Sequence, residues 1–195
     1  IPGSGAARGV APSSPAGRLI AAHSGIFGAV DLEFTDPHAG AGGWGASAAQ
    51  FLMCYAALER MGANAAHAPP AIDVERILSA YVDVAWDGRG YSPSGADIIA
   101  QLEGGIVEFA KTDGVLRKHA WPFDDLEFFF LPTGNKVATH KHLRDLGPID
   151  STVFSAHASA ACAALLSRDS ARFVEGLCGY AAELGPDDPM IDALL

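Results

Sequence analysis

The sequence Asp36-Pro37-His38-Ala39-Gly40-Ala41-Gly42-Gly43-Trp44-Gly45-Ala46-Ser47-Ala48-Ala49 places four glycines within six positions. Just before it, residues 29–34 alternate apolar and polar side chains as a half-buried strand does, and residues 45–60 carry the apolar spacing of a helix. Strand, glycine loop and helix in this order offer unpaired backbone N–H groups and a positive helix end to an anion, typically a phosphate. The stretch therefore predicts a phosphate-binding loop.

The loop also has features of a dinucleotide-binding fingerprint, of a P-loop and of a structural turn. Gly40, Gly42 and Gly45 fit the dinucleotide pattern G-x-G-x-x-G, but the acid expected about 20 positions later, at the end of a second strand, is absent. The acid near that offset, Glu59, falls inside the predicted helix. A P-loop needs a lysine directly after its last glycine, and no lysine precedes Lys111, which excludes that motif. A purely structural turn before a packed helix stays open.

Composition limits the classes of function. The 195 residues are 49% hydrophobic and 18% charged, which is typical of a core-forming globular protein. A net charge of -10 argues against a nucleic-acid partner, and no apolar run is long enough to cross a bilayer. The three cysteines, Cys54, Cys162 and Cys178, lack metal-ligand spacing and indicate free thiols in a reducing cytoplasm. We expect a cytoplasmic protein without a membrane segment.

A second glycine-containing motif opens a helical stretch at Ser94-Gly95-Ala96-Asp97, followed by Gly104-Gly105 and a predicted strand over residues 106–109. Phosphoryl transfer needs one group that accepts or orients the acceptor's proton, and a helix N-terminus favours the negative charge of an aspartate. Ser94 and Asp97 are equally suited to plain helix capping. Both interpretations of Asp97 stay open.

A third motif, Pro132-Thr133-Gly134-Asn135-Lys136-Val137-Ala138-Thr139, follows a predicted buried strand over residues 126–131. Lys136 is either a contact to an anionic acceptor or a solvated loop lysine, and Thr139 also suits a helix N-cap. Further predicted elements are a strand over residues 18–22, a helix capped by Asp73, and helices after Thr139 that break at residues 147–148, 168–169 and 185–186.

The three motifs resemble segments of the GHMP kinases, most closely mevalonate and phosphomevalonate kinases. Residues 37–49 resemble the P-x3-G-L-G-S-S-A-A nucleotide loop, residues 94–105 resemble S-G-x-D…G-G, and residues 132–139 resemble W-T-G-x-x-x-x-T, in family order over residues 37–146. The resemblance implies an α+β fold, a two-layer α/β sandwich of GHMP type with a helix-rich C-terminal half. Residues 1–110 would belong to the nucleotide-binding N-terminal domain and residues 111–195 to the C-terminal domain.

The same resemblance implies an ATP- and Mg²⁺-dependent kinase that phosphorylates a small anionic metabolite, mevalonate or phosphomevalonate, in isoprenoid precursor synthesis. Asp97 and Lys136 would be catalytic, Ser47 would bind Mg²⁺, and the oligomeric state stays open between monomer and homodimer. The residues implied to hold the nucleotide are Gly42, Gly43, Trp44, Gly45, Ala46 and Ser47. Those implied to contact the acceptor are Ser94, Gly95 and Thr139.

The chain departs from the family pattern at several points. Ala46 stands where the first loop serine is usual, and Trp44 replaces the usual leucine. The N-terminal P-G-K/R-x-x-L-x-G-E-H segment and the C-terminal G-x-G-G-G loop are not found, and the chain begins at Ile1 rather than Met. We expect either an incomplete chain or a degenerate relative that binds nucleotide or metabolite without turnover.

Overall fold

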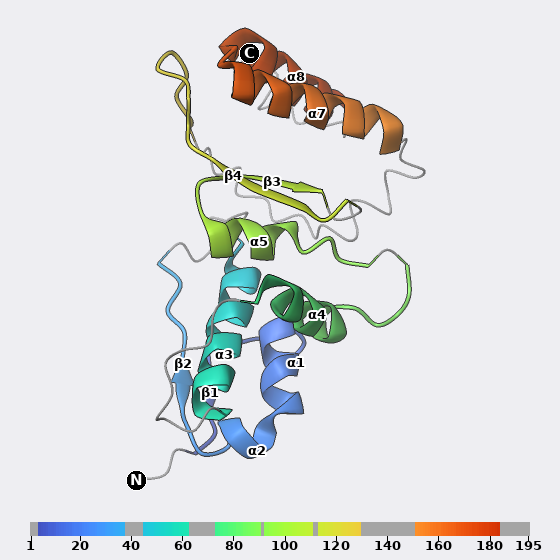
Figure 1. The fold of residues 1–195 in the computed structure, drawn as a ribbon. Coiled ribbons are helices and arrows are strands. Elements are labelled where there is room, and N and C mark those ends of the chain that lie inside the picture. Colours follow the sequence, from blue (N-terminus) through green and yellow to red (C-terminus); the bar gives the residue numbers. More distant parts are fainter. Residues whose placement is uncertain are drawn as a thin grey trace. The chain divides into compact units, whose positions relative to one another are not determined.

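The computed structural model describes residues 4–37, 45–62, 73–90, 92–110, 113–129 and 151–183 (Figure 1). The chain divides into two compact units, one formed by Ile1–Ala39 and Gly43–Lys118, the other by Gly40–Gly42 and His119–Leu195. Helices and small sheets occur together, so the α+β class predicted from the sequence is confirmed at this level. The two-layer sandwich stays a prediction.

The first unit contains most of the described elements. They are β1 (Ala7–Arg8), α1 (Pro15–Ala22), α2 (Ser24–Phe27), β2 (Leu32–Glu33), α3 (Ala46–Gly62), α4 (Val74–Ala85), α5 (Ala96–Glu103), β3 (Ile106–Ala110) and β4 (Val115–His119), of which only the last residue, His119, falls in the second unit. Strands β1 and β2 pair in parallel, with Ala7 opposite Leu32, and β3 pairs with β4 in a second two-stranded sheet. The connection between β3 and β4 is so short that the pair is a hairpin.

The core of the first unit lies between its helices. Helix α1 packs against α3 and α4, and α5 packs against α3 (Figure 1). Phe51 of α3 and Ile98 of α5 are fully buried there, and the ring of Tyr81 in α4 meets the Phe51 ring edge-on at a centroid distance of 5.1 Å. Burying side chains of this size stabilises the fold by about 1.5–3 kcal/mol each. This core holds α3, α4 and α5 against one another.

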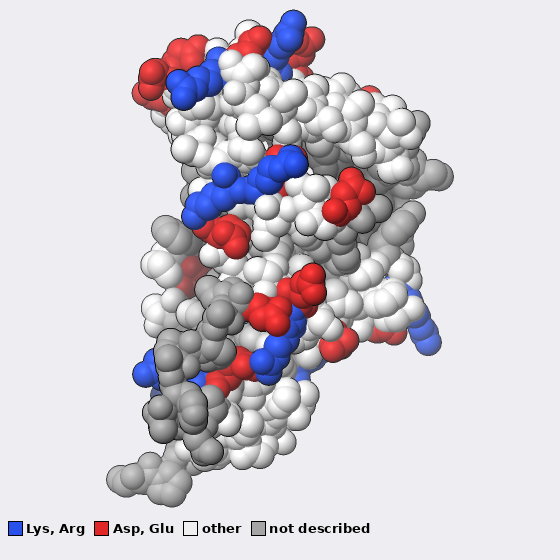
Figure 2. All heavy atoms as spheres, viewed as in Figure 1, with Lys and Arg blue, Asp and Glu red and all other residues white. Residues whose placement is uncertain are grey.

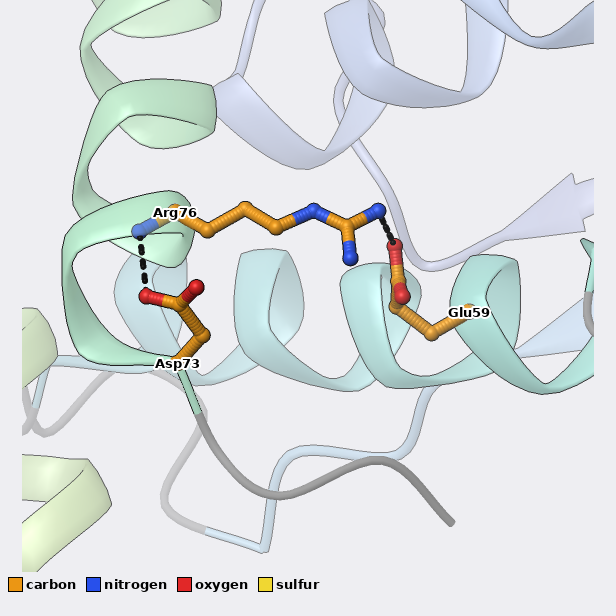
Figure 3. Close-up of polar contacts among 3 residues, drawn as sticks. All are labelled: Glu59, Asp73 and Arg76. Carbon is orange, nitrogen blue, oxygen red and sulfur yellow. Dashed lines mark hydrogen bonds and ion pairs between the residues drawn. The ribbon is translucent and has the colours of Figure 1, made fainter.

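The start of α4 is tied to α3 by a short polar chain (Figure 3). The Asp73 carboxylate accepts a hydrogen bond of 3.0 Å from the Arg76 N–H, and the Arg76 guanidinium donates to Glu59 Oε1 at 2.8 Å. The helix with Asp73 as its N-cap is therefore confirmed. Because the Arg76 side chain is largely exposed, its ion pair with Glu59 contributes no more than about 1 kcal/mol.

The second unit contains a helical pair, α7 (Ser151–Ser167) and α8 (Ser170–Glu183), which pack against each other. The predicted break at residues 168–169 is confirmed: Arg168 has a φ of 59°, and the Asp169 N–H donates to Ala164 O at 3.0 Å. The ring of Phe173 in α8 contacts the rings of Trp121 and Phe123. The predicted breaks at residues 147–148 and 185–186 lie outside the described residues.

Two predicted strands are wrong and one is shortened. Residues 18–22 lie in α1, whose first turn is capped by Ser14 Oγ accepting from the Gly17 N–H at 3.1 Å. The strand predicted over residues 29–34 is reduced to β2. Residues 126–129 form no strand, and the side chains of Phe128 and Phe129 are 60% and 78% exposed rather than buried. The remainder of that prediction, residues 130–131, lies outside the described residues.

Charged side chains form small, mixed groups on the face of the molecule drawn in Figure 2. On the face drawn in Figure 2, Lys and Arg side chains are interspersed with Asp and Glu side chains. In β3 and β4, for example, Arg117 donates to Glu108 at 3.0 Å. A search of the described helices finds none with the length and apolar character needed to cross a membrane.

Candidate functional site

The helix that follows the glycine loop begins as the sequence predicts. Gly45 precedes α3 with a φ of 68°, a left-handed conformation that favours glycine, and its carbonyl accepts the first helical hydrogen bond, from the Ala49 N–H at 3.0 Å. Ala46 and Ser47 occupy the first turn and are exposed. The first N–H groups of a helix have no partner inside it, so this end of α3 offers donors to an anion.

Five of the predicted site residues cannot be placed. Gly42, Gly43 and Trp44 of the loop, and Lys136 and Thr139 of the third motif, lie outside the described residues. Their roles remain predictions from the resemblance.

The second motif forms the start of α5, as predicted. Gly95 is its N-cap with a φ of 77°, and a Cβ at this position would run into the side chain of Leu78 in α4. Ser94 Oγ accepts from the Ala96 N–H at 3.3 Å, and Asp97 Oδ1 accepts from the Ile98 N–H at 3.0 Å. Both side chains thus satisfy backbone donors at the helix start, which agrees with the capping interpretation and leaves the catalytic one open.

The Asp97 carboxylate lies at an exposed position near Tyr81. Burial, and after it the negative charge of Asp97, raises the pKa of the Tyr81 hydroxyl. An open depression of about 230 Å³ is lined by residues of α4 and by the motif's serine: Leu78, Ser79, Val82, Asp83 and Ser94. Asp97 itself does not line this depression, although Ser94 precedes it by three positions in the sequence.

A single side chain joins the first two motifs. Gln101, in α5, donates from Nε2 to the carbonyl oxygen of Gly45 at 2.9 Å, across 56 positions of sequence. Figure 1 shows α5 next to the N-terminal end of α3, where this bond forms. The glycine loop's last residue and the helix carrying Asp97 are therefore neighbours. Sequence reasoning missed Gln101, although its position four residues after Asp97 puts both side chains on one helix face.

The described residues contain no group of three or more His, Cys, Asp or Glu side chains that could hold a metal ion. Mg²⁺ in kinases is commonly held by one or two protein ligands together with substrate phosphates and water. The exposed Ser47 hydroxyl, in the first turn of α3, fits the role of such a single ligand.

The position of Glu59 bears on the dinucleotide interpretation. Glu59 lies inside α3, near its C-terminal end, and is paired with Arg76. A ribose-binding acid would instead end a strand beside the loop. As the sequence also indicated, Glu59 does not lie where a ribose-binding acid would lie.

Comparison of the chain with protein-family models, with curated proteins and with solved structures finds no match.

Proposed function

We propose that the chain is a GHMP-type kinase that transfers the γ-phosphoryl group of ATP to a small anionic metabolite, with mevalonate or phosphomevalonate as the leading acceptors. The proposal includes the two-layer GHMP sandwich and a cytoplasmic location. The observation that carries it is the hydrogen bond from Gln101 to Gly45, because it brings the end of the glycine loop next to the helix that bears Asp97. A kinase of this kind needs its phosphate-binding and acceptor-binding groups side by side.

The residues have distinct proposed roles. The first-turn amides of α3, with Gly42, Gly43 and Gly45, bind the phosphates, and Ser47 adds a hydroxyl to the Mg²⁺ coordination. Asp97 orients the attacking oxygen of the acceptor, which is a hydroxyl in mevalonate and a phosphate oxygen in phosphomevalonate. The bond between Pγ and the β–γ bridging oxygen breaks, and a bond from the acceptor oxygen to Pγ forms. Where a hydroxyl attacks, its proton passes to Asp97 and then to solvent. The products are ADP and the phosphorylated acceptor.

One departure supports a second candidate, a degenerate member of the same family that binds nucleotide without turnover. Ala46, exposed in the first turn of α3, lacks the hydroxyl that the family loop usually has there. The loss of one oxygen near the phosphates weakens charge stabilisation during transfer more than it weakens binding.

The test measures ATP consumption by the full chain with Mg²⁺, against mevalonate, phosphomevalonate, homoserine and galactose in turn. We expect turnover with one acceptor, reduced by about 10²–10⁴-fold in Asp97→Asn. Asparagine retains an oxygen for the Ile98 N–H, so this variant removes the negative charge and keeps the cap. Asp97→Ala removes both.

The control for capping is Asp73→Ala, since Asp73 also satisfies an amide at a helix start. It is expected to lower stability and leave turnover per folded molecule unchanged. Equal turnover in Asp97→Asn and the wild type would overturn the catalytic role of Asp97. ATP binding without turnover on any acceptor would favour the degenerate module, and absence of ATP binding would overturn both candidates.

A further inference from the structure

The carbonyl of Gly45 is held from two sides. It accepts the helical hydrogen bond from the Ala49 N–H at 3.0 Å and a second bond from the Gln101 amide at 2.9 Å. A Cβ at position 45 would collide with the Gln101 Nε2 atom, so the space beside this glycine is filled by the amide itself. Gln101 and Gly45 together form a contact that fixes the start of α3 against α5, and we call it the Gln101–Gly45 contact.

The contact acts on the same face of α5 that carries Asp97. Residues four apart on a helix lie about one turn, or about 6 Å, apart along one face. The neighbouring positions, Ile98 and Ile99, are fully buried, which prevents α5 from turning about its axis. The place of the Asp97 carboxylate relative to the first turn of α3 is therefore set by the core on one side and by Gln101 on the other.

We propose that Gln101 is a positioning residue of the proposed kinase: by holding the Gly45 carbonyl, it keeps Asp97 in register with the phosphate-binding end of α3. This inference rests on the proposed function. Misplacement of a catalytic group by about 1 Å lowers the rate of group transfer by up to about 10²-fold, while each substrate still contacts its own binding groups. Loss of the contact should thus reduce kcat and leave the two KM values nearly unchanged.

The test compares Gln101→Met with Gln50→Met. Methionine has a similar length and cannot donate. Gln50 is a matched control because its Nε2 also donates to a glycine carbonyl, that of Gly9, and also at 2.9 Å. We expect Gln101→Met to lower kcat about tenfold with KM values for ATP and acceptor within about threefold of wild type. Gln50→Met should leave kcat unchanged.

A double-mutant cycle separates positioning from general stability. If Gln101 acts through Asp97, Gln101→Met should add almost nothing to the loss already caused by Asp97→Asn. A full tenfold additional loss in the Asp97→Asn background would overturn the inference, as would a wild-type kcat in Gln101→Met.

A measurement without turnover distinguishes failure of this inference from failure of the proposed function. Hydrogen exchange at the Ala49 amide, which donates to the same carbonyl, should become about tenfold faster in Gln101→Met and stay unchanged in Gln50→Met. Unchanged exchange at the Ala49 amide in Gln101→Met would show that the contact does not stabilise the start of α3, which overturns the inference. Faster exchange in Gln101→Met, in a chain that neither binds nor consumes ATP, would show that the contact exists. It would nevertheless overturn the proposed function and, with it, the positioning role of Gln101.

Discussion

The reactivity of the cysteines differs residue by residue because their exposure differs. Cys54 lies in the core, where burial raises the pKa of its thiol to about 11, while Cys178 is exposed on α8. At pH 8 about one Cys54 thiol in a thousand is ionised, and the thiolate is the reacting form. We expect an aromatic disulfide reagent at pH 8 to modify Cys178 at least about a hundredfold faster than Cys54.

The reaction is followed by the absorbance of the released thiol, with and without denaturant. Cys178→Ser should remove the fast phase, and Cys54→Ala should leave it in place. Equal rates at the two sites in the folded chain would contradict the burial of Cys54.

Asp31 links the N-terminal segment to the residues before β2. Its Oδ1 accepts from the Ser4 hydroxyl at 2.8 Å, the Ser4 N–H at 2.8 Å and the Ala6 N–H at 3.1 Å. These hydrogen bonds, that of the Ser4 side chain first, lower the pKa of the Asp31 carboxyl below its ordinary 3.8. The carboxylate's contribution to stability is therefore complete above the unfolded-state pKa and is lost as the pH falls through the lower folded-state pKa.

We expect Asp31→Asn to be less stable than wild type at pH 7, with a difference that shrinks as the pH falls below about 3.8 and the wild-type carboxylate becomes protonated. Urea unfolding between pH 3 and pH 7 measures this difference. Asp31→Ala deletes the acceptor and should stay destabilised at every pH. A gap between wild type and Asp31→Asn that does not vary with pH would contradict the prediction.

At the residue scale, the sequence predicts local contacts and misses distant ones. Asp73 could be assigned as an N-cap because an Asp directly before a helical apolar pattern has a local partner, the amide three residues later. Gln101 could not be assigned, because its partner is the carbonyl of Gly45, which has no side chain and no sequence signal of its own.

At the scale of elements, close packing of α7 against α8 depends on Gly176. A Cβ added there would lie 3.0 Å from Ala161 N and 3.1 Å from Ala161 Cβ, closer than ordinary van der Waals contact. We expect Gly176→Val to destabilise the chain by about 1–3 kcal/mol, because the helices would have to move apart. The free energy of unfolding, followed by helical circular dichroism in urea, measures the effect.

Ala181→Val is the control for a β-branched side chain at an exposed position of the same helix. Valine has lower helix propensity than alanine but not than glycine, so Ala181→Val is the variant in which propensity acts against the helix. A Gly176→Val chain as stable as wild type would contradict the close packing at this position.

The elements that the sequence predicted well have long patterns or strong caps. Helices α3, α4 and α5 combine apolar spacing with a glycine or aspartate at their start, and β3 follows a pair of glycines. The short apolar run at residues 18–22 fits strand and helix equally, and only its cap, Ser14 with Pro15 at the first helical position, distinguishes them. The phenylalanines at 128 and 129 indicated burial, but hydrophobicity alone does not place a side chain inside.

At the scale of the whole molecule, net charge controls association between copies. The chain carries -10 at pH 7, and its isoelectric point is near 5.0. Repulsion between copies should therefore be strong at pH 7–8 and nearly absent at pH 5. We expect light scattering of a dilute solution to be greatest near pH 5.

Addition of about 0.5 M NaCl at pH 7.5 should increase scattering slightly by screening the repulsion, and should change it less at pH 5. Maximal scattering at pH 7.5 in low salt would contradict the electrostatic explanation and point to apolar contacts instead.

The arrangement of the whole chain was the least predictable from sequence. The mixed α+β class follows from the local patterns, and the structure confirms it. The GHMP sandwich and the domain division at residue 110 remain predictions from resemblance, because they depend on long-range pairing that no local pattern specifies. For the same reason, the glycine loop and the motif at residues 94–97 could be predicted separately from the sequence. The hydrogen bond from Gln101 that links the helix of the second motif to Gly45 could be found only in the structure.

The two hydrogen bonds received by the Gly45 carbonyl also have an electronic consequence. Each donor draws electron density toward the oxygen, and peptide resonance passes that withdrawal to the nitrogen of the same peptide group, which belongs to Ala46. Polarisation of this kind strengthens a neighbouring hydrogen bond by about 10–30%. The backbone N–H of Ala46 therefore becomes a more strongly polarised donor at the start of α3. If an anion binds at this end of α3, as proposed, the hydrogen bond from Gln101 would strengthen donation by the Ala46 N–H to that anion through the peptide bond itself.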